Sequence, residues 1–288
     1  MKPLTRCLLP MLASAGLLQP ALAAPALWEV RDGDSAIWLF GSFHVLPEGA
    51  EWRTALFDEV LADADRVFFE ADVRPAAVAQ VGADAFVRGI YVDGTLLTDL
   101  LDETLEAQLR AEAAALGMPM GMLLAMKPWM ATNTISVQAM MANGYDMDGV
   151  EFVVQPELEE ARMGFLETGA EQLDVLSGAP EDEQLAMLQA TLDQLELLPK
   201  ALDKMKTRWL NGTPEMLADL FLMEAGGFET AFLDRLIYAR NQNWIAPLET
   251  MLADNEENLV IVGAAHLIGE GSVLDLLEQQ GYEIERIQ

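Results

Sequence analysis

Two short apolar runs, far apart in the chain, lead into the same pattern of glycine, two further residues and histidine. Residues 37–40 are followed by Gly-Ser-Phe-His ending at His44, and residues 259–262 by Gly-Ala-Ala-His ending at His266. An apolar β-prone run bounded by glycine is typical of a buried strand that ends in a tight turn or a close backbone approach. We therefore expect each histidine to lie just past the carboxyl end of a buried strand.

The pattern around the first run predicts further strands. Residues 27–30 and 36–40 flank the turn sequence Asp-Gly-Asp and predict a hairpin. Residues 52–64 have apolar positions at helical spacing, and residues 66–70 then predict a second buried strand. Strand, helix and strand in this order indicate a parallel pair.

Helical spacing prevails through the middle of the chain, and the C-terminal end returns to strands. The expected elements are helices over most of 75–161, a strand at 165–168, helices over 180–205 and 228–254 with a shorter one from Pro214 between them, a strand up to His266, a helix over 271–280 and a strand over 282–287. These elements predict an α/β (α+β) fold in one domain over 24–288. A small mixed sheet would come from about 26–72 and 258–288, with a large helical insertion over about 75–254.

The first 23 residues resemble a targeting segment. A basic start with Lys2 and Arg6, an apolar stretch over 7–18 and Ala-Leu-Ala at 21–23 predict a cleavable signal peptide over 1–23. The mature protein would then be periplasmic or secreted, with no stable membrane anchor. Cys7, the one cysteine, would be lost with the signal, which excludes disulfides and thiolate chemistry.

Charge narrows the classes of partner. The chain carries 47 acidic against 17 basic residues, a formal net charge of −30, and loss of Lys2 and Arg6 makes it two units more negative. Such a field repels phosphate backbones and anionic lipid and favours cations. We expect no nucleic-acid partner, and we expect most of the charge to lie on solvated helix faces.

The candidate chemistry gathers at the strand ends. Glu70 ends the second buried strand as His44 follows the first, so both are expected at the carboxyl edge of the sheet, where ligands bind in open α/β folds. Two imidazoles and a carboxylate are a common ligand set of zinc and manganese. Asp72, two residues on, is a further ligand or a partner of one, or else a solvated loop residue. The alternative is two unrelated histidines, each hydrogen-bonded at its own strand end.

Other polar residues are weaker candidates. Arg240 and Asn241 lie in a predicted helix, where an inward Arg would hold a carboxylate or stabilise an oxyanion, although a surface Arg is the ordinary outcome. Glu167 follows a predicted strand and is expected near the same edge. Glu270 and Ser272 begin the last helix, where a capping role is favoured.

Six segments together resemble one known family. They are 39–47 around His44, Phe-Glu-Ala-Asp at 69–72, Leu-Glu-Thr at 166–168 with Glu-Gln-Leu at 171–173, Arg-Asn-x-x-Trp at 240–244, 262–272 around His266, and Gly-Tyr at 281–282. In this order they resemble the TraB/GumN family, which includes the pheromone-shutdown protein PrgY and is related to the Tiki metalloproteases. One departure, Gly-Glu-Gly-Ser-Val at 269–273, concerns the start of the last helix and not the centre.

The resemblance implies a divalent-metal-dependent hydrolase with His44, His266 and Glu70 at its centre. Mn²⁺ or Zn²⁺ is expected, with Co²⁺ as a further candidate, and the substrate would be a peptide or another small hydrolysable molecule. Glu70 would be a ligand or the general base, while Arg240 and Asn241 would serve catalysis and Asp72, Glu167 and Glu270 would support the ligands.

Two other functions stay open. Wider kinship with erythromycin esterases implies a metal-free hydrolase in which His44 or His266 is the general base. A protein that binds a peptide or polysaccharide fragment without catalysis belongs to another class, although titratable groups converging at strand ends argue against it. The substrate, the native metal and the oligomeric state are not fixed by the sequence.

Overall fold

One mixed sheet forms the centre of the protein in the computed structural model, which describes residues 23–146, 149–217 and 230–288. Its strand order is β6-β4-β7-β2-β1-β8. The strands are β1 (Leu27–Arg31), β2 (Ala36–Ser42), β4 (Arg66–Phe69), β6 (Met163–Phe165), β7 (Asn258–Gly263) and β8 (Glu283–Arg286). The expected fold class and the N-terminal hairpin β1–β2 are confirmed.

The strand β7, from the C-terminal part of the chain, lies between β2 and β4 and pairs with both in parallel. The predicted strand pair β2 and β4 is therefore parallel but not adjacent. All six residues of β7 are buried, as is typical of a strand that is covered on both faces. This order places the carboxyl ends of β2, β7 and β4 side by side.

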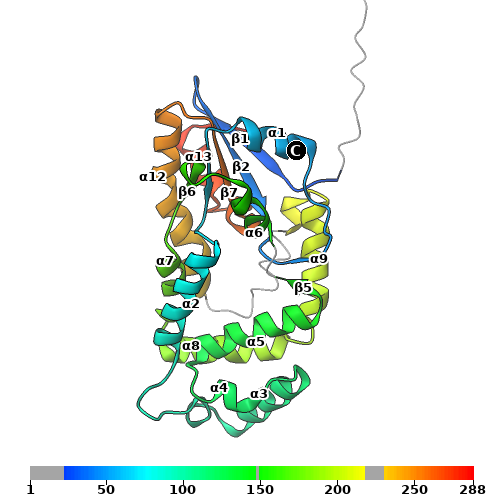
Figure 1. Cartoon of the computed structure of the whole chain (residues 1–288), viewed down its shortest axis with the longest axis vertical. Coiled ribbons are helices and arrows are strands. Elements are labelled where there is room, and N and C mark those ends of the chain that lie inside the picture. The colour runs from blue at the N-terminus through cyan, green and yellow to red at the C-terminus, as the bar shows by residue number, and fades with distance from the viewer. Residues whose placement is uncertain (1–22, 147–148, 218–229) are drawn as a thin grey trace, which may run out of the picture.

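Alternate residues of β7 pack into two cores on opposite faces of the sheet. Leu259 and Ile261 join a cluster with Phe40 and Phe69, covered by α1 (Ala55–Asp63). On the other face Val260 and Val262 join a second cluster, covered by α12 (Ala239–Ala253) and α13 (Val273–Gln280). Figure 1 shows α12 and α1 on opposite sides of the strands.

The helical insertion extends away from the sheet and has a core of its own, around Leu109, Ile135 and Leu188. Its helices are α2 (Pro75–Gly89), α3 (Glu103–Ala115), α4 (Met120–Leu123), α5 (Pro128–Ala142), α6 (Val150–Val154), α7 (Gly169–Ser177), α8 (Glu181–Gln194) and α9 (Leu198–Leu210). In Figure 1, α5 and α8 run across the molecule below the sheet, and α3 lies at the end of the insertion farthest from the sheet.

Short elements complete the described chain. They are the strands β3 (Leu46–Pro47) and β5 (Tyr145–Asp146), which pair with each other, the 3-10 turns η1 (Leu97–Leu100), η2 (Gln155–Glu157), η3 (Glu160–Arg162) and η6 (Ala264–Leu267), the helix α11 (Thr230–Leu233) and the π-helical turn η5 (Asp234–Tyr238). Because β3 begins two residues after His44, its pairing with β5 ties the segment after the first histidine to the helical insertion.

Three boundaries differ from the sequence expectation. The helix expected over 180–205 is two helices, and Pro199 stands in the first turn of the second, where its missing N–H costs nothing. The strand expected at 165–168 ends at Phe165, because Thr168 instead caps α7 through a capping box with Glu171. The last long strand ends at Gly263, so His266 lies in η6 and not in the strand.

Several expectations concern the ends of the described segments. The predicted signal peptide falls outside the described residues apart from Ala23, and so does the start of the helix expected over 228–254. Pro214 begins a helical segment, as expected.

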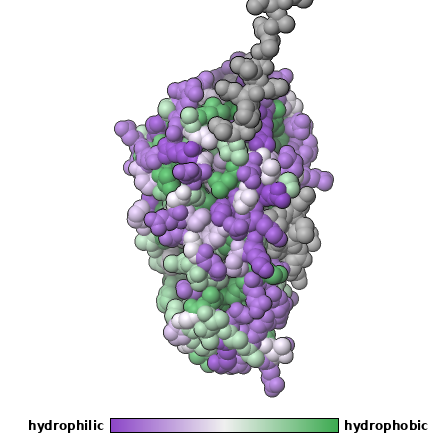
Figure 2. Space-filling view, turned by 90° about the vertical axis from the view of Figure 1, so that its right-hand side faces the viewer, coloured by the Kyte–Doolittle hydropathy of each residue, from purple (hydrophilic) through white to green (hydrophobic). Residues whose placement is uncertain are grey.

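Within the described residues, no helix combines the length and the apolar character that crossing a membrane requires. Figure 2 shows hydrophilic side chains over much of one face, interrupted by apolar patches.

Candidate functional site

The two histidines and Glu70 meet at the carboxyl edge of the three adjacent parallel strands. Ser42 at the end of β2 pairs with Gly263 at the end of β7, and Phe69 at the end of β4 pairs with Ile261. In consequence, the Glu70 Oε1 atom lies 3.7 Å from Nε2 of His44 and 3.7 Å from Nε2 of His266. Residues more than two hundred positions apart are thereby brought into one cluster, as the sequence predicts.

The glycines of the two motifs permit close approach and do not form turns with positive φ. Gly263 has φ −52. A Cβ on Gly263 would lie 2.8 Å from Nε2 of His44 and 3.2 Å from Oε1 of Glu70, and a Cβ on Gly41 would lie 3.2 Å from the Ala264 Cα. The missing side chain at Gly263 therefore leaves room beside both functional groups.

His44 is held by a second carboxylate. Its side chain is 53% exposed, and its Nδ1 lies 3.1 Å from Oε1 of Glu151, a buried residue in the first turn of α6 that also accepts a hydrogen bond from Ser42. The negative charge of Glu151, supported by Glu70, raises the pKa of His44 to about 9. In this arrangement His44 is protonated at neutral pH.

His266 is buried and has the opposite protonation state. Its Nε2 lies 3.1 Å from Nη1 of Arg240, and its Nδ1 lies 2.7 Å from Oδ1 of Asn241. Because a guanidinium only donates, Nε2 must accept and the single proton lies on Nδ1. The Asn241 amide is oriented for this role, since its Nδ2 donates to the Gly271 carbonyl at 2.9 Å. Burial lowers the pKa of His266 to about 3.

Arg240 joins the acids to His266. Its Nε donates to both Glu167 oxygens at 3.1 Å, its Nη1 to the Leu236 carbonyl at 2.9 Å and to His266, and its Nη2 to Glu70 and Glu167. A guanidinium has five N–H groups, so every one of them has a protein partner. The observed contacts make Arg240 a positioning group for Glu70 and His266. Its predicted role as an oxyanion donor stays a prediction.

The local fold around Arg240 is unusual. The π-helical turn η5 ends two residues before it, and π turns are frequent at functional sites. Trp244, one helical turn later, packs its ring 4.9 Å from the Arg240 guanidinium carbon and 4.5 Å from the His266 ring. This packing restricts both side chains to one orientation.

Glu70 is buried and ionised. Its Oε1 accepts a hydrogen bond of 2.7 Å from the Gly263 N–H, and its Oε2 accepts from Arg240 and, at 3.2 Å, from Gln172. Burial alone would raise its pKa, but the two histidines, Arg240 and the Gly263 N–H lower it to about 2. Glu70 therefore carries its charge at any working pH.

The remaining candidates divide into two groups. Glu167 reaches the cluster through Arg240, as expected. Asp72 does not, because it pairs with Arg74, with 2.6 Å between Oδ2 and Nη2. Glu270 is exposed in the turn before α13, and the predicted capping is performed by Ser272, whose Oγ accepts from the Asp275 N–H.

Glu151 and Gln172 are the site residues that the sequence reasoning did not single out. Glu151 stands within the apolar run Gly-Val-Glu-Phe-Val-Val, and an acid in such a run is a signal of a buried, paired carboxylate. Gln172 is part of the Glu-Gln-Leu segment that carries the family resemblance, but the pattern assigns it no role. Both come from the helical insertion, whose packing against the sheet edge the periodicity does not specify.

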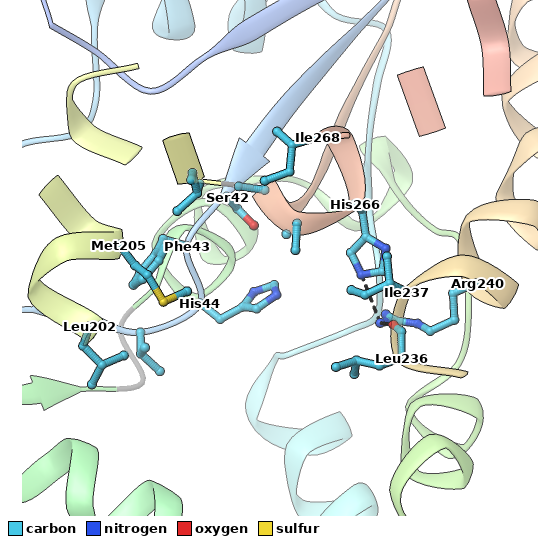
Figure 3. A pocket seen from close by; sticks show the side chains of 15 residues that line it. Ser42, Phe43, His44, Leu202, Met205, Leu236, Ile237, Arg240, His266 and Ile268 are labelled. Atoms are coloured by element: carbon cyan, nitrogen blue, oxygen red, sulfur yellow. Dashed lines mark hydrogen bonds between the residues drawn. The ribbon is translucent and has the colours of Figure 1, made fainter. Parts of the chain in front are cut away.

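A cavity of about 260 Å³ opens beside the cluster, lined by residues that include His44, Arg240, Gly263 and His266. In Figure 3, His44 reaches in from one side, and His266 and Arg240 lie together on the other. A small molecule in this cavity would contact the exposed His44 imidazole directly.

The fit of a divalent ion depends on Arg240. The donor types, two imidazole nitrogens and a carboxylate oxygen, suit zinc or manganese, and Gly263 carries no side chain that would crowd them. In the described part of the chain, however, no group of three His, Cys, Asp or Glu side chains is arranged to hold a metal ion. Binding of one ion by these donors would require Arg240 to release Nε2 of His266 and His44 to lose its proton.

Comparison with known protein families gives a match over most of the chain. The model of the TraB/PrgY/gumN family matches residues 26–286, which include both glycine–histidine motifs, Glu70 and Arg240. No curated protein and no solved structure matches the chain.

Proposed function

This chain belongs to the TraB/PrgY/gumN family, and we propose that it is an extracytoplasmic hydrolase, in the first place a peptidase, centred on His44, Glu70 and His266. The observation that carries the proposal is the position of Glu70 Oε1, 3.7 Å from Nε2 of each histidine, at the edge of a cavity. Three titratable groups with strongly shifted pKa values converging in a cleft are typical of a reaction centre.

The leading form of the proposal is metal-dependent. Nε2 of His44, Nε2 of His266 and Oε1 of Glu70 would hold the ion, with Mn²⁺, Zn²⁺ or Co²⁺ as candidates from the donor types. When bound, a divalent ion lowers the pKa of a water molecule and polarises a carbonyl oxygen. Arg240 would then keep Glu70 and Glu167 in place through its Nε and Nη2 atoms.

A metal-free form is favoured by a specific contact. Glu151 orients His44 through Nδ1, as a carboxylate orients the histidine of a catalytic triad, and leaves Nε2 facing the cavity. Once deprotonated, His44 would accept a proton from an attacking water molecule, and neutral His266 would stay fixed by Asn241 and Arg240. Because Glu151 raises the pKa of His44 to about 9, this reaction would be fastest in alkaline solution.

The experiment uses the mature chain purified with a tag free of histidine. Its metal content is measured, and hydrolysis of peptide and ester libraries is followed with and without added Mn²⁺, Zn²⁺ and Co²⁺. Glu70→Gln removes the central charge with little change in size, and Glu270→Gln is its matched control on an exposed turn. Hydrolysis that survives Glu70→Gln as well as it survives Glu270→Gln would rule out this centre.

If no hydrolysis appears but a peptide or polysaccharide fragment binds tightly, the non-catalytic function is the better description.

The metal requirement distinguishes the two forms of the hydrolase. A bound ion in the protein as isolated, with activity lost on chelation and restored by the same ion, supports the metal centre. Full activity in the chelated protein supports His44 as the base.

A further inference from the structure

The cavity beside the cluster has one polar end and apolar walls. Its apolar lining residues include Phe43, Leu202, Met205, Leu236, Ile237 and Ile268. They come from the segment after β2, from α9, from η5 and from the segment after η6. In Figure 3, Leu202 and Met205 lie on the His44 side, while Leu236 and Ile237 lie beside Arg240.

The polar side chains among the described lining residues are already engaged. Ser42 donates to Glu151, all N–H groups of Arg240 have partners, and both ring nitrogens of His266 are hydrogen-bonded. Among the described residues, Nε2 of His44 has no hydrogen-bond partner, and the Glu70 carboxylate oxygen is 3.7 Å away. Among the described lining side chains, a ligand in the cavity therefore finds one free polar atom, Nε2 of His44, and otherwise apolar groups.

The size of the cavity limits what can enter. Its volume of about 260 Å³ is below the ~300–1,000 Å³ of sites for drug-sized ligands. It is large enough for one aliphatic group, such as a leucine-sized side chain or a short acyl chain. An extended molecule would have to leave the rest of its length outside.

We propose that this cavity is a specificity pocket for an aliphatic group of the substrate, placed directly beside the carbonyl that is attacked. The link to a substrate rests on the proposed hydrolase function, whereas the preference for an aliphatic group rests on the walls alone. Met205 is the specificity-determining residue in this proposal. It is half-buried on α9, and a flexible thioether at this position adapts to groups of different shape.

The first test measures binding without chemistry. The probes are straight-chain N-methylamides from N-methylbutanamide to N-methyldecanamide, and the pair N-acetyl-leucine and N-acetyl-asparagine N-methylamide, which differ in polarity at nearly equal size. Calorimetry should show affinity rising about fourfold per added methylene until the pocket is full. The leucine compound should bind at least about fivefold tighter than the asparagine compound, since a buried amide would lack partners.

The point at which the series levels off identifies the source of the group. A plateau near hexanamide indicates an amino-acid side chain, and a rise that continues to decanamide indicates an acyl chain. Affinities that do not depend on chain length, or equal binding of the leucine and asparagine compounds, would overturn the proposal.

Variants of α9 locate the pocket wall. Met205→Trp should move the best-bound amide to a shorter chain, and Met205→Ala should move it to a longer one, so the two shifts have opposite directions. Thr207→Trp is the matched control, because Thr207 is exposed on the same helix. If neither Met205 variant changes the chain-length preference, Met205 does not line the binding site.

His44→Ala separates this proposal from the proposed function. The variant should lose hydrolysis, yet it should keep the chain-length dependence of binding, because the apolar walls are intact. Chain-length-dependent binding with no hydrolysis in the wild-type protein would overturn the hydrolase and leave the pocket standing. Hydrolysis that is indifferent to the aliphatic group would do the reverse.

Discussion

Nη1 of Arg240 lies 3.1 Å from Nε2 of His266, so the second motif histidine accepts a hydrogen bond from a permanent cation. This contact, together with burial, keeps His266 neutral. His44 lies on the other side of the Glu70 carboxylate, and Glu151 holds it in the charged form. The two histidines follow the same sequence pattern, but their environments give them opposite protonation states.

The two histidines should titrate far apart. In the metal-free protein, proton NMR should show one ring signal titrating near pH 9, from His44, and one that stays neutral down to about pH 3, from His266. The protein has only these two histidines, so His44→Gln assigns both signals. Two titrations near the ordinary value of about 6.5 would contradict the described contacts.

These shifts also predict how stability depends on pH. The raised pKa of His44 stabilises the fold fully below about pH 6.5, and this contribution is lost as the pH rises through about 9. The lowered pKa of His266 acts in the other direction, because below about pH 6.5 the unfolded chain takes up a proton that the folded chain refuses until about pH 3. The free energy of unfolding should therefore decline on both sides of neutral pH.

The sequence predicts the cluster because its three members are fixed by strands. Apolar runs ending at Gly41, Gly263 and Glu70 reveal buried parallel strands, and parallel strands end at one edge. The second carboxylate, Glu151, could not be placed, because it reaches the edge from a short helix whose position depends on tertiary packing. The chemistry of Arg240 depends on the register set by the π turn, which helical periodicity does not report.

Glu151→Gln should return His44 toward ordinary behaviour. Glu151 has a larger effect on the imidazole than Glu70, so removing its charge lowers the pKa of His44 from about 9 toward 6.5, while Ser42 can still donate to the amide oxygen. In a metal-free hydrolase the midpoint of the pH–rate profile should fall by a similar amount. Glu157 is an exposed partner of Arg53, and Glu157→Gln is the control. It should change neither the pKa of His44 nor the midpoint of the pH–rate profile.

Arg240→Leu should destabilise the protein by about 3–5 kcal/mol, because it leaves two buried carboxylates, Glu70 and Glu167, without their shared cation. The loss should be largest at neutral pH and smaller in acid, where Glu70 can take up a proton. Arg110→Leu breaks an exposed pair with Glu106 and should cost no more than about 1 kcal/mol. Equal unfolding free energies for the two variants, from denaturant titration, would refute the positioning role of Arg240.

Metal binding should release one proton per ion and not two. Two histidines with ordinary pKa values would lose affinity steeply between about pH 6 and 5. His266 is already neutral, and His44 is protonated below about pH 9. The affinity for the metal ion should therefore fall about tenfold for each unit by which the pH is lowered, through the whole neutral range. Calorimetry with Mn²⁺ and Zn²⁺ in buffers of different ionisation enthalpy counts the protons. Affinity that is flat with pH would mean that His44 is not a ligand.

Gly263→Ala should block the centre while the fold survives. The added Cβ would lie 2.8 Å from Nε2 of His44 and 3.2 Å from Oε1 of Glu70. Because His44 is half-exposed, its ring can turn away. The substitution should therefore lengthen the 3.7 Å distance between His44 Nε2 and Glu70 Oε1 and leave the sheet pairing intact. Hydrolysis or metal affinity should then fall at least tenfold, with a normal circular dichroism spectrum. Gly82→Ala, where an added Cβ meets open space on α2, is the matched control and should be silent. Full activity in Gly263→Ala would show that the space beside His44 and Glu70 is not used.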